Sequence, residues 1–509
     1  MAWARYRPAP VAEPGGGAND TVGIRSAATA SSVYFGAHVL LIGASVISMP
    51  ILTRLLSKAE YGLVSLIFGT VTILAVVGGL GLGEATVRFY GERRKDGPDA
   101  VRAVCDTMVG GALAFGLVVG AVTALAASQL MGDLPENYAR CLGPVCLLVL
   151  IRIVSGVLYQ IYRAQERAVA YAANLVIARY ATMVCAIALL LLTERTAFAV
   201  LVATVIVEFA AAAVRFIDLA MRGTVSRPRL PRSMIARAIA YGAPLAVAGA
   251  AHLFLSYGDR LVIERFLGLD AVATYSVPYD IAERLGDLLL LPAQLAVVPI
   301  IFRLWSEEGS RATGQFVSQV FTYMIAVLIP AAALYAIFSR EVIVLLASSK
   351  YEESAALTPY LLPGVLLGSM NFIVVVGHTI RKETARLALN VFAAAVLNVA
   401  LNLLLVPFWH LVGAAVATTI AYAMLVALNY WQSRDVVTLR LDGPVIRKAL
   451  LAALVMIALV WGLGPVSALP LVDLSVRATA GAGMAVLSFG LLDGNARQWA
   501  WARLWGKSA

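Results

Sequence analysis

Fourteen apolar runs, each long enough to cross a bilayer as a helix, constrain this 509-residue chain more than any other feature. About 20 apolar residues match the ~30 Å hydrocarbon core of a membrane. The chain is 61% hydrophobic and only 14% charged, which leaves more apolar surface than a water-soluble fold of this length could bury. We therefore predict an all-α, polytopic membrane protein with spans at 33–53, 61–83, 103–127, 141–162, 174–193, 197–217, 238–258, 277–302, 317–338, 357–380, 387–407, 411–432, 449–464 and 474–492.

The basic residues fall unevenly on the two sides that these spans define. With the N-terminus in the cytoplasm, 28 of the 40 Lys and Arg residues lie on the cytoplasmic side, eight on the outer side and four within spans. Cytoplasmic loops are enriched in Lys and Arg, so we expect both termini in the cytoplasm. The net charge of +10 then reflects topology and contact with anionic membrane lipids. We expect no nucleic-acid partner, because no basic patch carries interleaved aromatic residues.

The longest cytoplasmic connection, 218–237, separates six spans from six similar spans and a final pair. A weak internal repeat crosses it: the pattern RLL-x5-G-x2-S ending at Ser65 recurs as RFL-x5-A-x2-S ending at Ser276, 211 residues later. Repeats are common in transporters, and this one favours two lobes of the same topology over chance similarity. The predicted organisation is a disordered cytoplasmic tail (1–32), an N-terminal six-helix lobe (33–217), a basic linker (218–237), a C-terminal six-helix lobe (238–432), and helices 13 and 14 with a cytoplasmic tail (433–509).

Several functions are disfavoured by what the sequence lacks. The Gly-Lys-Ser at 506–508 has no earlier glycine of a phosphate-binding loop, so we expect no ATP motor in this chain. The outer loops reach only 18 residues, too few for a catalytic domain, and the loop 339–356 is expected to hold a short interfacial helix. The histidines are scattered and the cysteines lack metal-binding spacing. We therefore expect no enzymatic activity, no cofactor and no metal site.

The strongest polar pattern lies in the eighth span. Asp280, Arg284, Asp287 and Gln294 are spaced i, i+4, i+7 and i+14, which places them on one helix face, with Arg284 within pairing reach of both aspartates. A charge at bilayer depth costs about 2.5–3.5 kcal/mol even on the mildest scale, so the stripe must face protein or a water-filled cavity. It is either a neutralised structural pair or the wall of a cavity that meets a polar substrate.

Other polar side chains also lie within predicted spans. Arg152 and Glu208 have no local partner of opposite charge. They form either an interhelical ion pair or, respectively, a cavity charge and a protonatable coupling site. Arg179 either extends toward the cytoplasmic interface or lines the same cavity. Asn398, one of three asparagines at multiples of four along the eleventh span, is interpreted as an interhelical contact first and as cavity lining second.

Three blocks of sequence resemble a known family. They are SMPILTRLLSKAEYGLVSL (48–66), YGAPLAVAGAAHLFLSYGDRLVIERFLGLDAVATYSVPYDIAERL (241–285), and AVLNVALNLLLVPFWHLVGAAVATTIAY (395–422). In this order they resemble the Wzx-type polysaccharide transporters. These are oligosaccharide-lipid flippases of the multidrug/oligosaccharidyl-lipid/polysaccharide (MOP) exporter superfamily, and the similarity runs from about residue 30 to 435.

The resemblance implies two lobes of MATE-like topology. They would carry polyprenyl-pyrophosphate-linked oligosaccharide repeat units across the bacterial plasma (inner) membrane by alternating access. The process served would be the biosynthesis of lipopolysaccharide O-antigen, capsule or exopolysaccharide. Its expected partners are this lipid-linked oligosaccharide, membrane lipids, and a polymerase with other polysaccharide assembly proteins.

Arginine binds phosphate oxygens bidentately, so the resemblance also implies roles for the charges within the spans. The Asp-Arg pair of the second block is expected at the outer interface. The implied roles are diphosphate binding for Arg284, Arg152 and Arg179, cavity lining or ion coupling for Asp280, Asp287 and Glu208, and family-motif positions for Asp259, Arg260 and Asn398.

Three other functions stay open. A cation-coupled small-molecule exporter of the same superfamily would favour an acidic and aromatic cavity, whereas the unpaired charges here are mostly arginines. A lipid II flippase would share the fold and differ in the sugar that it carries. A membrane polysaccharide polymerase or ligase is disfavoured by the short outer loops.

Overall fold

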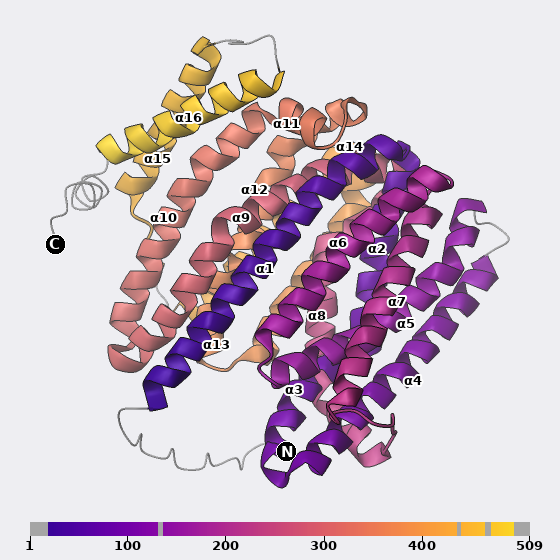
Figure 1. Ribbon diagram of the computed structural model, residues 1–509. Helices are drawn as coiled ribbons and strands as arrows, with labels where there is room; N and C mark the ends of the chain where they lie inside the picture. The colour runs from indigo at the N-terminus through magenta and orange to yellow at the C-terminus, as the bar shows by residue number, and fades with distance from the viewer. Residues whose placement is uncertain (1–18, 131–135, 435–438, 464–469, 493–509) are drawn as a thin grey trace.

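The computed structural model describes residues 19–130, 136–434, 439–463 and 470–492, and nearly all of these are helical (Figure 1). Eleven helices are long and apolar enough to cross a membrane, and a twelfth is counted when the two bent parts of α9 (Leu269–Glu307) are taken as one span. No strand occurs among the described residues. The predicted all-helical, multi-pass membrane fold is confirmed.

The first lobe holds the first six predicted spans. Its helices are α1 (Asn19–Leu55), α2 (Lys58–Gly79), α3 (Leu82–Arg93), α4 (Pro98–Leu130), α5 (Glu136–Ala164), α6 (Ala168–Leu192) and α7 (Ala197–Met221), with the 3-10 turn η1 (Arg94–Asp96) after α3. α1 packs mainly on α6, and α5 packs on α4 and α7. Residues 19–32, part of the predicted disordered tail, instead continue α1 toward the N-terminus; residues 1–18 lie outside the described chain.

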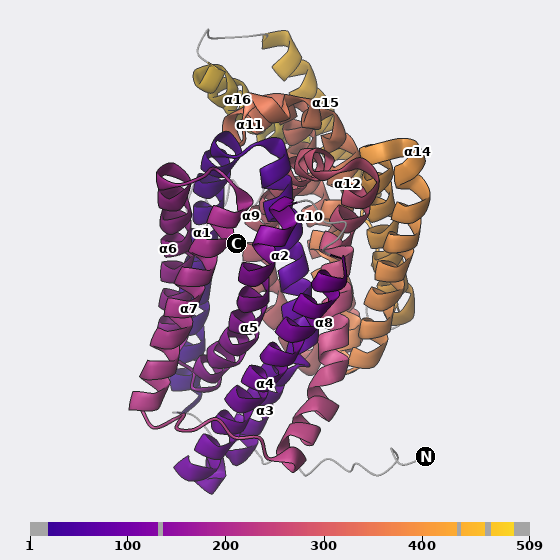
Figure 2. The same cartoon turned by 90° about the vertical axis from the view of Figure 1, so that its right-hand side faces the viewer.

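The second lobe follows a connection shorter than predicted. Its elements are α8 (Arg232–Leu267), α9, α10 (Gly309–Ile337), α11 (Ser339–Leu346), the 3-10 helix η2 (Ser349–Leu357), α12 (Thr358–Val374), α13 (Val376–Ile380) and α14 (Thr384–Ser433), followed by α15 (Gly443–Leu463) and α16 (Pro470–Leu492). α11 is the short helix expected in the loop 339–356. α15 and α16 lie at the end of the bundle where α11 lies (Figure 2). The predicted span 474–492 falls on α16, which is not one of the eleven.

α14 contains two predicted spans, 387–407 and 411–432, folded against each other. The backbone leaves helical geometry at His410, where φ is 51° and ψ is −135°. The side chain of Asn390 donates to Asn429 Oδ1 at 2.8 Å, and that of Asn398 donates to Thr418 Oγ1 at 3.2 Å. Since these partners lie at matching distances before and after His410, the two halves run antiparallel as a helical hairpin.

The lobes meet along α2 and α9, and repeat-equivalent residues touch there. Ser65 Oγ and Ser276 Oγ, the residues that end the two repeated patterns, are hydrogen-bonded at 2.9 Å. Three residues earlier, a Cβ added to Gly62 would lie 2.1 Å from the carbonyl oxygen of Leu269, so the backbones can approach this closely only with glycine. A contact between equivalent residues places a pseudo-two-fold axis between the lobes, which supports the predicted repeat.

A second close approach breaks the predicted span 61–83. Leu80 (φ 46°) and Gly81 (φ 70°) separate α2 from α3. A Cβ on Gly81 would lie 2.1 Å from the carbonyl oxygen of Gly242 on α8. Glycine is required here both for its left-handed backbone and for the contact between lobes.

Candidate functional site

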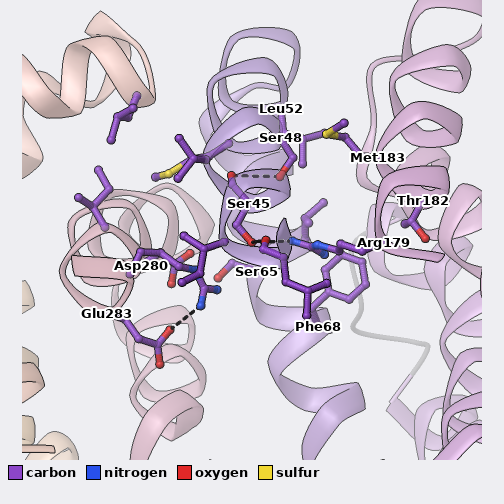
Figure 3. Close-up of a pocket in the computed structure, with 18 of the residues that line it drawn as sticks. Ser45, Ser48, Leu52, Ser65, Phe68, Arg179, Thr182, Met183, Asp280 and Glu283 are labelled. Carbon is purple, nitrogen blue, oxygen red and sulfur yellow. Dashed lines mark hydrogen bonds and ion pairs between the residues drawn. The ribbon is translucent and has the colours of Figure 1, made fainter. Parts of the chain in front are cut away.

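A cavity of about 1300 Å³ lies between the lobes. Its walls come from α1, α2, α5, α6 and α7 of the first lobe and from α8, α9, α10, α11 and α16. Figure 3 shows hydroxyl and charged side chains that line the cavity on facing helices. Charged residues on its wall are Arg152, Arg179, Arg215, Arg260, Arg284, Glu208, Asp280 and Glu283.

Arg152 and Glu208 form an ion pair between α5 and α7. The distance from Arg152 Nη2 to Glu208 Oε1 is 3.1 Å, and each side chain is 24% exposed. Arg152 Nη1 also donates to Thr72 Oγ1 at 3.1 Å, and its guanidinium lies 5.4 Å from the ring centre of Phe68. Of the two predicted interpretations, the structure therefore favours the interhelical pair.

Of the two aspartates of the α9 stripe within reach of Arg284, only Asp287 pairs with it. Asp280 accepts from Arg260 Nη2 on α8 at 3.0 Å, and Arg284 pairs instead with Asp287 at 3.4 Å and with Glu283 at 3.9 Å. The expected pairing of Asp280 with Arg284 is wrong, because the fully buried guanidinium of Arg260 has the greater need for a carboxylate.

Glu283 was not predicted as a site residue. It lies beside Arg284 in the sequence, and its carboxylate points toward the same space as Asp280 in Figure 3. The adjacent Glu-Arg pair was the one signal that could have identified it.

The predicted span ends at residue 258, which places Asp259 and Arg260 at the outer interface. In the structure both are instead buried where the two lobes meet. α8 continues to Leu267, well beyond the predicted end of this span at 258. Arg260 Nε donates to both Ser65 and Ser276 at 3.1 Å, so this one guanidinium joins the equivalent serines of the two lobes. Hydropathy ends a predicted span at such charges, although here they neutralise each other within the protein.

Arg179 extends into the cavity (Figure 3). Its Nη2 donates to Ser45 Oγ on α1 at 3.3 Å, and none of the salt bridges found among the described residues includes it. Of the two predicted interpretations of Arg179, the structure therefore favours the one in which it lines the cavity.

Arg215, which falls at the cytoplasmic end of the predicted span 197–217, is a further cavity residue. It is only 2% exposed, and its Nη atoms donate to Tyr159 Oη at 2.9 Å and to Ser155 Oγ at 2.8 Å. Its Nε has no hydrogen-bond partner, and no carboxylate in the described chain pairs with it. Because α7 continues to Met221, Arg215 lies more than a turn inside the helix, a position that no local sequence signal marks.

A buried oxygen-rich cluster adjoins the cavity in the second lobe. Asn398 donates to Thr418, and Asn402 donates to Asn398 Oδ1 at 3.2 Å, while the hydroxyl of Tyr275 lies 3.4 Å from Thr418 Oγ1 and close to Asp259. Asp259 Oδ2 and Asn402 Oδ1 are buried and accept no hydrogen bond from the part of the chain that the structure describes. Within the same residues, no group of three or more His, Cys, Asp or Glu side chains could hold a metal ion.

Several solved structures share this fold. The lipid II flippase MurJ in an inward closed conformation is 11% identical, with a TM-score of 0.64, and the match covers 91% of this chain and 98% of MurJ. An inward-facing multidrug resistance MATE family transporter of the MOP superfamily is 14% identical, with a TM-score of 0.58 and 78% and 93% of the two chains covered. The two lobes and the cavity between them are therefore the fold that this chain shares with a flippase and with a MATE family transporter.

Sequence comparison identifies the family. Residues 28–305 match the profile of the family described as polysaccharide biosynthesis protein, and the chain belongs to that family. A membrane protein of Methanocaldococcus jannaschii is 26% identical over 203 residues, and this match covers 39% of each chain. The family is one of polysaccharide biosynthesis, and the two structural neighbours are a flippase and a transporter.

Proposed function

We propose that this protein is a flippase that moves polyprenyl-pyrophosphate-linked oligosaccharide repeat units across the bacterial plasma membrane. It would serve O-antigen, capsule or exopolysaccharide biosynthesis, with both termini in the cytoplasm. The observation that carries the proposal is that Arg179 and Arg215 face the cavity without a carboxylate partner in the described chain. A diphosphate diester carries two negative charges, and guanidinium groups bind phosphate oxygens through charge-assisted hydrogen bonds. Two uncompensated arginines therefore match this ligand in charge.

The other two arginines assigned to the diphosphate take different roles in this proposal. Arg152 is held by Glu208 and Thr72, which suits support of the cavity wall. Arg284 is 38% exposed and its ion pairs are long, so its guanidinium can turn toward a phosphate without breaking a close ion pair. Because Arg152 and Arg284 are each paired with a carboxylate, they add little net charge to the cavity. Arg179 and Arg215 are therefore the main anion-binding groups in this proposal.

The size of the cavity supports an oligosaccharide head group over a drug. Typical small-molecule sites occupy about 300–1,000 Å³, and this cavity holds about 1300 Å³. Hydroxyl groups line it as well, including Ser45, Ser48 and Thr182 (Figure 3), and such groups can hydrogen-bond to sugar hydroxyls. A small-molecule exporter would leave much of this polar wall without a ligand.

The oxygen-rich cluster supports cation coupling as part of the same transport. Asp259 Oδ2 and Asn402 Oδ1 are buried acceptors without a hydrogen bond in the described chain, and the Arg260 guanidinium that pairs with Asp259 is shared with Asp280. Hard monovalent cations prefer such oxygen donors, and ion sites of transporters lie near the repeat interface. We propose that a cation binds at Asp259 and that its gradient drives the conformational change.

This coupling makes a direct prediction. Asp259→Asn is expected to abolish the stimulation of transport by a cation gradient, because it removes the charge that would attract the ion. Transport would be measured in vesicles with sodium and proton gradients applied separately. Glu307→Gln, which changes an exposed carboxylate at the end of α9, is the matched control and should keep the stimulation. Equal stimulation in Asp259→Asn and its parent would rule out this site.

The leaflet location of the lipid-linked oligosaccharide tests the function itself. In a strain that lacks this gene, we expect the lipid-linked repeat unit to accumulate on the cytoplasmic leaflet, and restoring the gene should relieve this. Normal translocation with unpolymerised repeats outside would indicate a polymerase or ligase instead. A block in lipid II with normal polysaccharide precursors would indicate a lipid II flippase, and no change in any lipid would indicate a small-molecule exporter.

A further inference from the structure

Near the ends of α1 and α11, side chains of each lobe donate hydrogen bonds to backbone carbonyl groups of the other lobe. Lys350 of the second lobe donates from Nζ to the carbonyl oxygens of Arg54 at 3.0 Å and Leu56 at 3.1 Å. In the opposite direction, Arg54 Nη2 donates to the carbonyl oxygen of Leu345 at 3.0 Å. Thr53 Oγ1 donates to the carbonyl oxygen of Ala347 at 2.8 Å. We call these contacts of Thr53, Arg54 and Lys350 the latch.

The chemistry of the latch follows from the ends of the helices. The last carbonyl groups of an α-helix have no partner within the helix, and a cation there also interacts favourably with the helix dipole. At the end of α1 the cation comes from the second lobe, and at the end of α11 it comes from the first lobe. Each lobe therefore completes a helix end of the other.

The latch lies directly over one end of the cavity. Leu52 and Leu346 line the cavity, and the next residues along the chain, Thr53 and Ala347, are hydrogen-bonded to each other. Beside them the rings of Tyr61 and Tyr351 meet edge to face with centroids 5.9 Å apart. Any opening of the cavity between α1 and α11 must separate these pairs.

We propose that Arg54 and Lys350 are positioning residues that keep the cavity closed at the α11 end, and that the latch breaks in each transport cycle. The proposal rests on the alternating access assumed in the proposed function. Two of the carbonyl groups that accept hydrogen bonds in the latch, those of Arg54 and Leu345, lie near the surface of the bundle. Water can replace their lost partners there after opening. The buried hydroxyl of Thr53 keeps the carbonyl oxygen of Met49 as an acceptor at 2.8 Å within α1, and water that enters on opening can replace the partner that Ala347 loses.

The test measures how fast a cavity residue reacts from the α11 side. Thr182, which lines the cavity (Figure 3), would be changed to cysteine after Cys105, Cys141, Cys146 and Cys185 are replaced by alanine. A membrane-impermeant maleimide would be applied to each face of sealed vesicles, and an exposed Glu341→Cys would identify the α11 face. Thr53→Val, which removes one hydrogen bond of the latch, is expected to raise the labelling rate from that face by about fivefold. Lys350→Met, which removes at least two, should raise it further.

Arg340→Met is the matched control, because Arg340 pairs with Glu352 within the second lobe and close to the latch. Its labelling rate should equal that of the parent. Unchanged labelling in both latch variants, with a normal elution volume in detergent, would overturn the proposal, and so would an equal rise in the control. Labelling needs no substrate, so fast labelling together with a normal leaflet distribution in the deletion strain would overturn the proposed function and leave the latch intact.

Discussion

Replacing Arg215 with methionine is expected to reduce transport about a hundredfold while leaving the protein at least as stable as its parent. The guanidinium is buried and bonds only to the neutral hydroxyl groups of Ser155 and Tyr159. Replacing a buried charge with an apolar side chain of similar size is often neutral or stabilising. The loss of charge-assisted hydrogen bonds to a phosphate, at about 1.5–3 kcal/mol each, accounts for the loss of transport.

The two readouts must be taken on the same protein preparation. Transport would be measured as translocation of lipid-linked oligosaccharide in vesicles, and stability as the midpoint of thermal unfolding in detergent. Arg179→Met should show the same combination, since Arg179 also lacks a carboxylate partner in the described chain. Arg163→Met, on an exposed residue bonded to Gln160, should change neither. If Arg215→Met unfolds at a lower temperature and transport falls only in proportion to the folded fraction, Arg215 has a structural role.

Arg152→Met is expected to have the opposite effect, with a loss of stability that a second substitution restores. Removing the arginine leaves Glu208 in the cavity wall without its cation. Breaking a fully buried pair costs about 3–5 kcal/mol. Because each side chain is 24% exposed, we expect about 2 kcal/mol here. Glu208→Gln in the same chain removes the uncompensated charge and should recover most of this loss.

A double-mutant cycle measures this coupling directly. The unfolding free energies of Arg152→Met, Glu208→Gln and the double variant would be compared with that of the parent. Additive effects of the two single substitutions would contradict the ion pair. Together with the Arg215 variants, the cycle separates arginines that stabilise the cavity wall from those that remain available to a ligand.

The length of the apolar runs was sufficient to predict the membrane fold, because a run of about 20 apolar residues can cross a bilayer by itself. The offset of 211 residues also predicted that Ser65 and Ser276 are equivalent, and the structure places them in contact. The ion pairs could not be predicted in the same way. Asp280 and Arg284 are one turn apart, yet Asp280 pairs with Arg260 of another helix. Local spacing shows which partners are possible, but burial decides which of them is needed.

Arg215 shows a second limit of sequence reasoning. Near the end of a predicted span, a residue that lies at the interface and one that lies inside the protein have the same local sequence. Only the continuation of α7 to Met221 and the neighbouring hydroxyl groups on α5 reveal its position. The kink at His410 was easier to predict than the length of α8. A gap in hydrophobicity is visible in the sequence, whereas an ion pair that allows a helix to continue is not.

The contact of Ser65 with Ser276 is the contact that two copies of a single lobe would make as a homodimer, in which one surface patch faces its own copy. Joining the copies in one chain frees them to differ. At the same offset of 211 residues, Arg260 corresponds to Met49 and Asp280 to Gly69. A symmetric dimer would bring two arginines and two aspartates at these positions to its axis, whereas the joined chain places one arginine there, paired with Asp280 and Asp259, and leaves the first lobe without a charge at the equivalent positions.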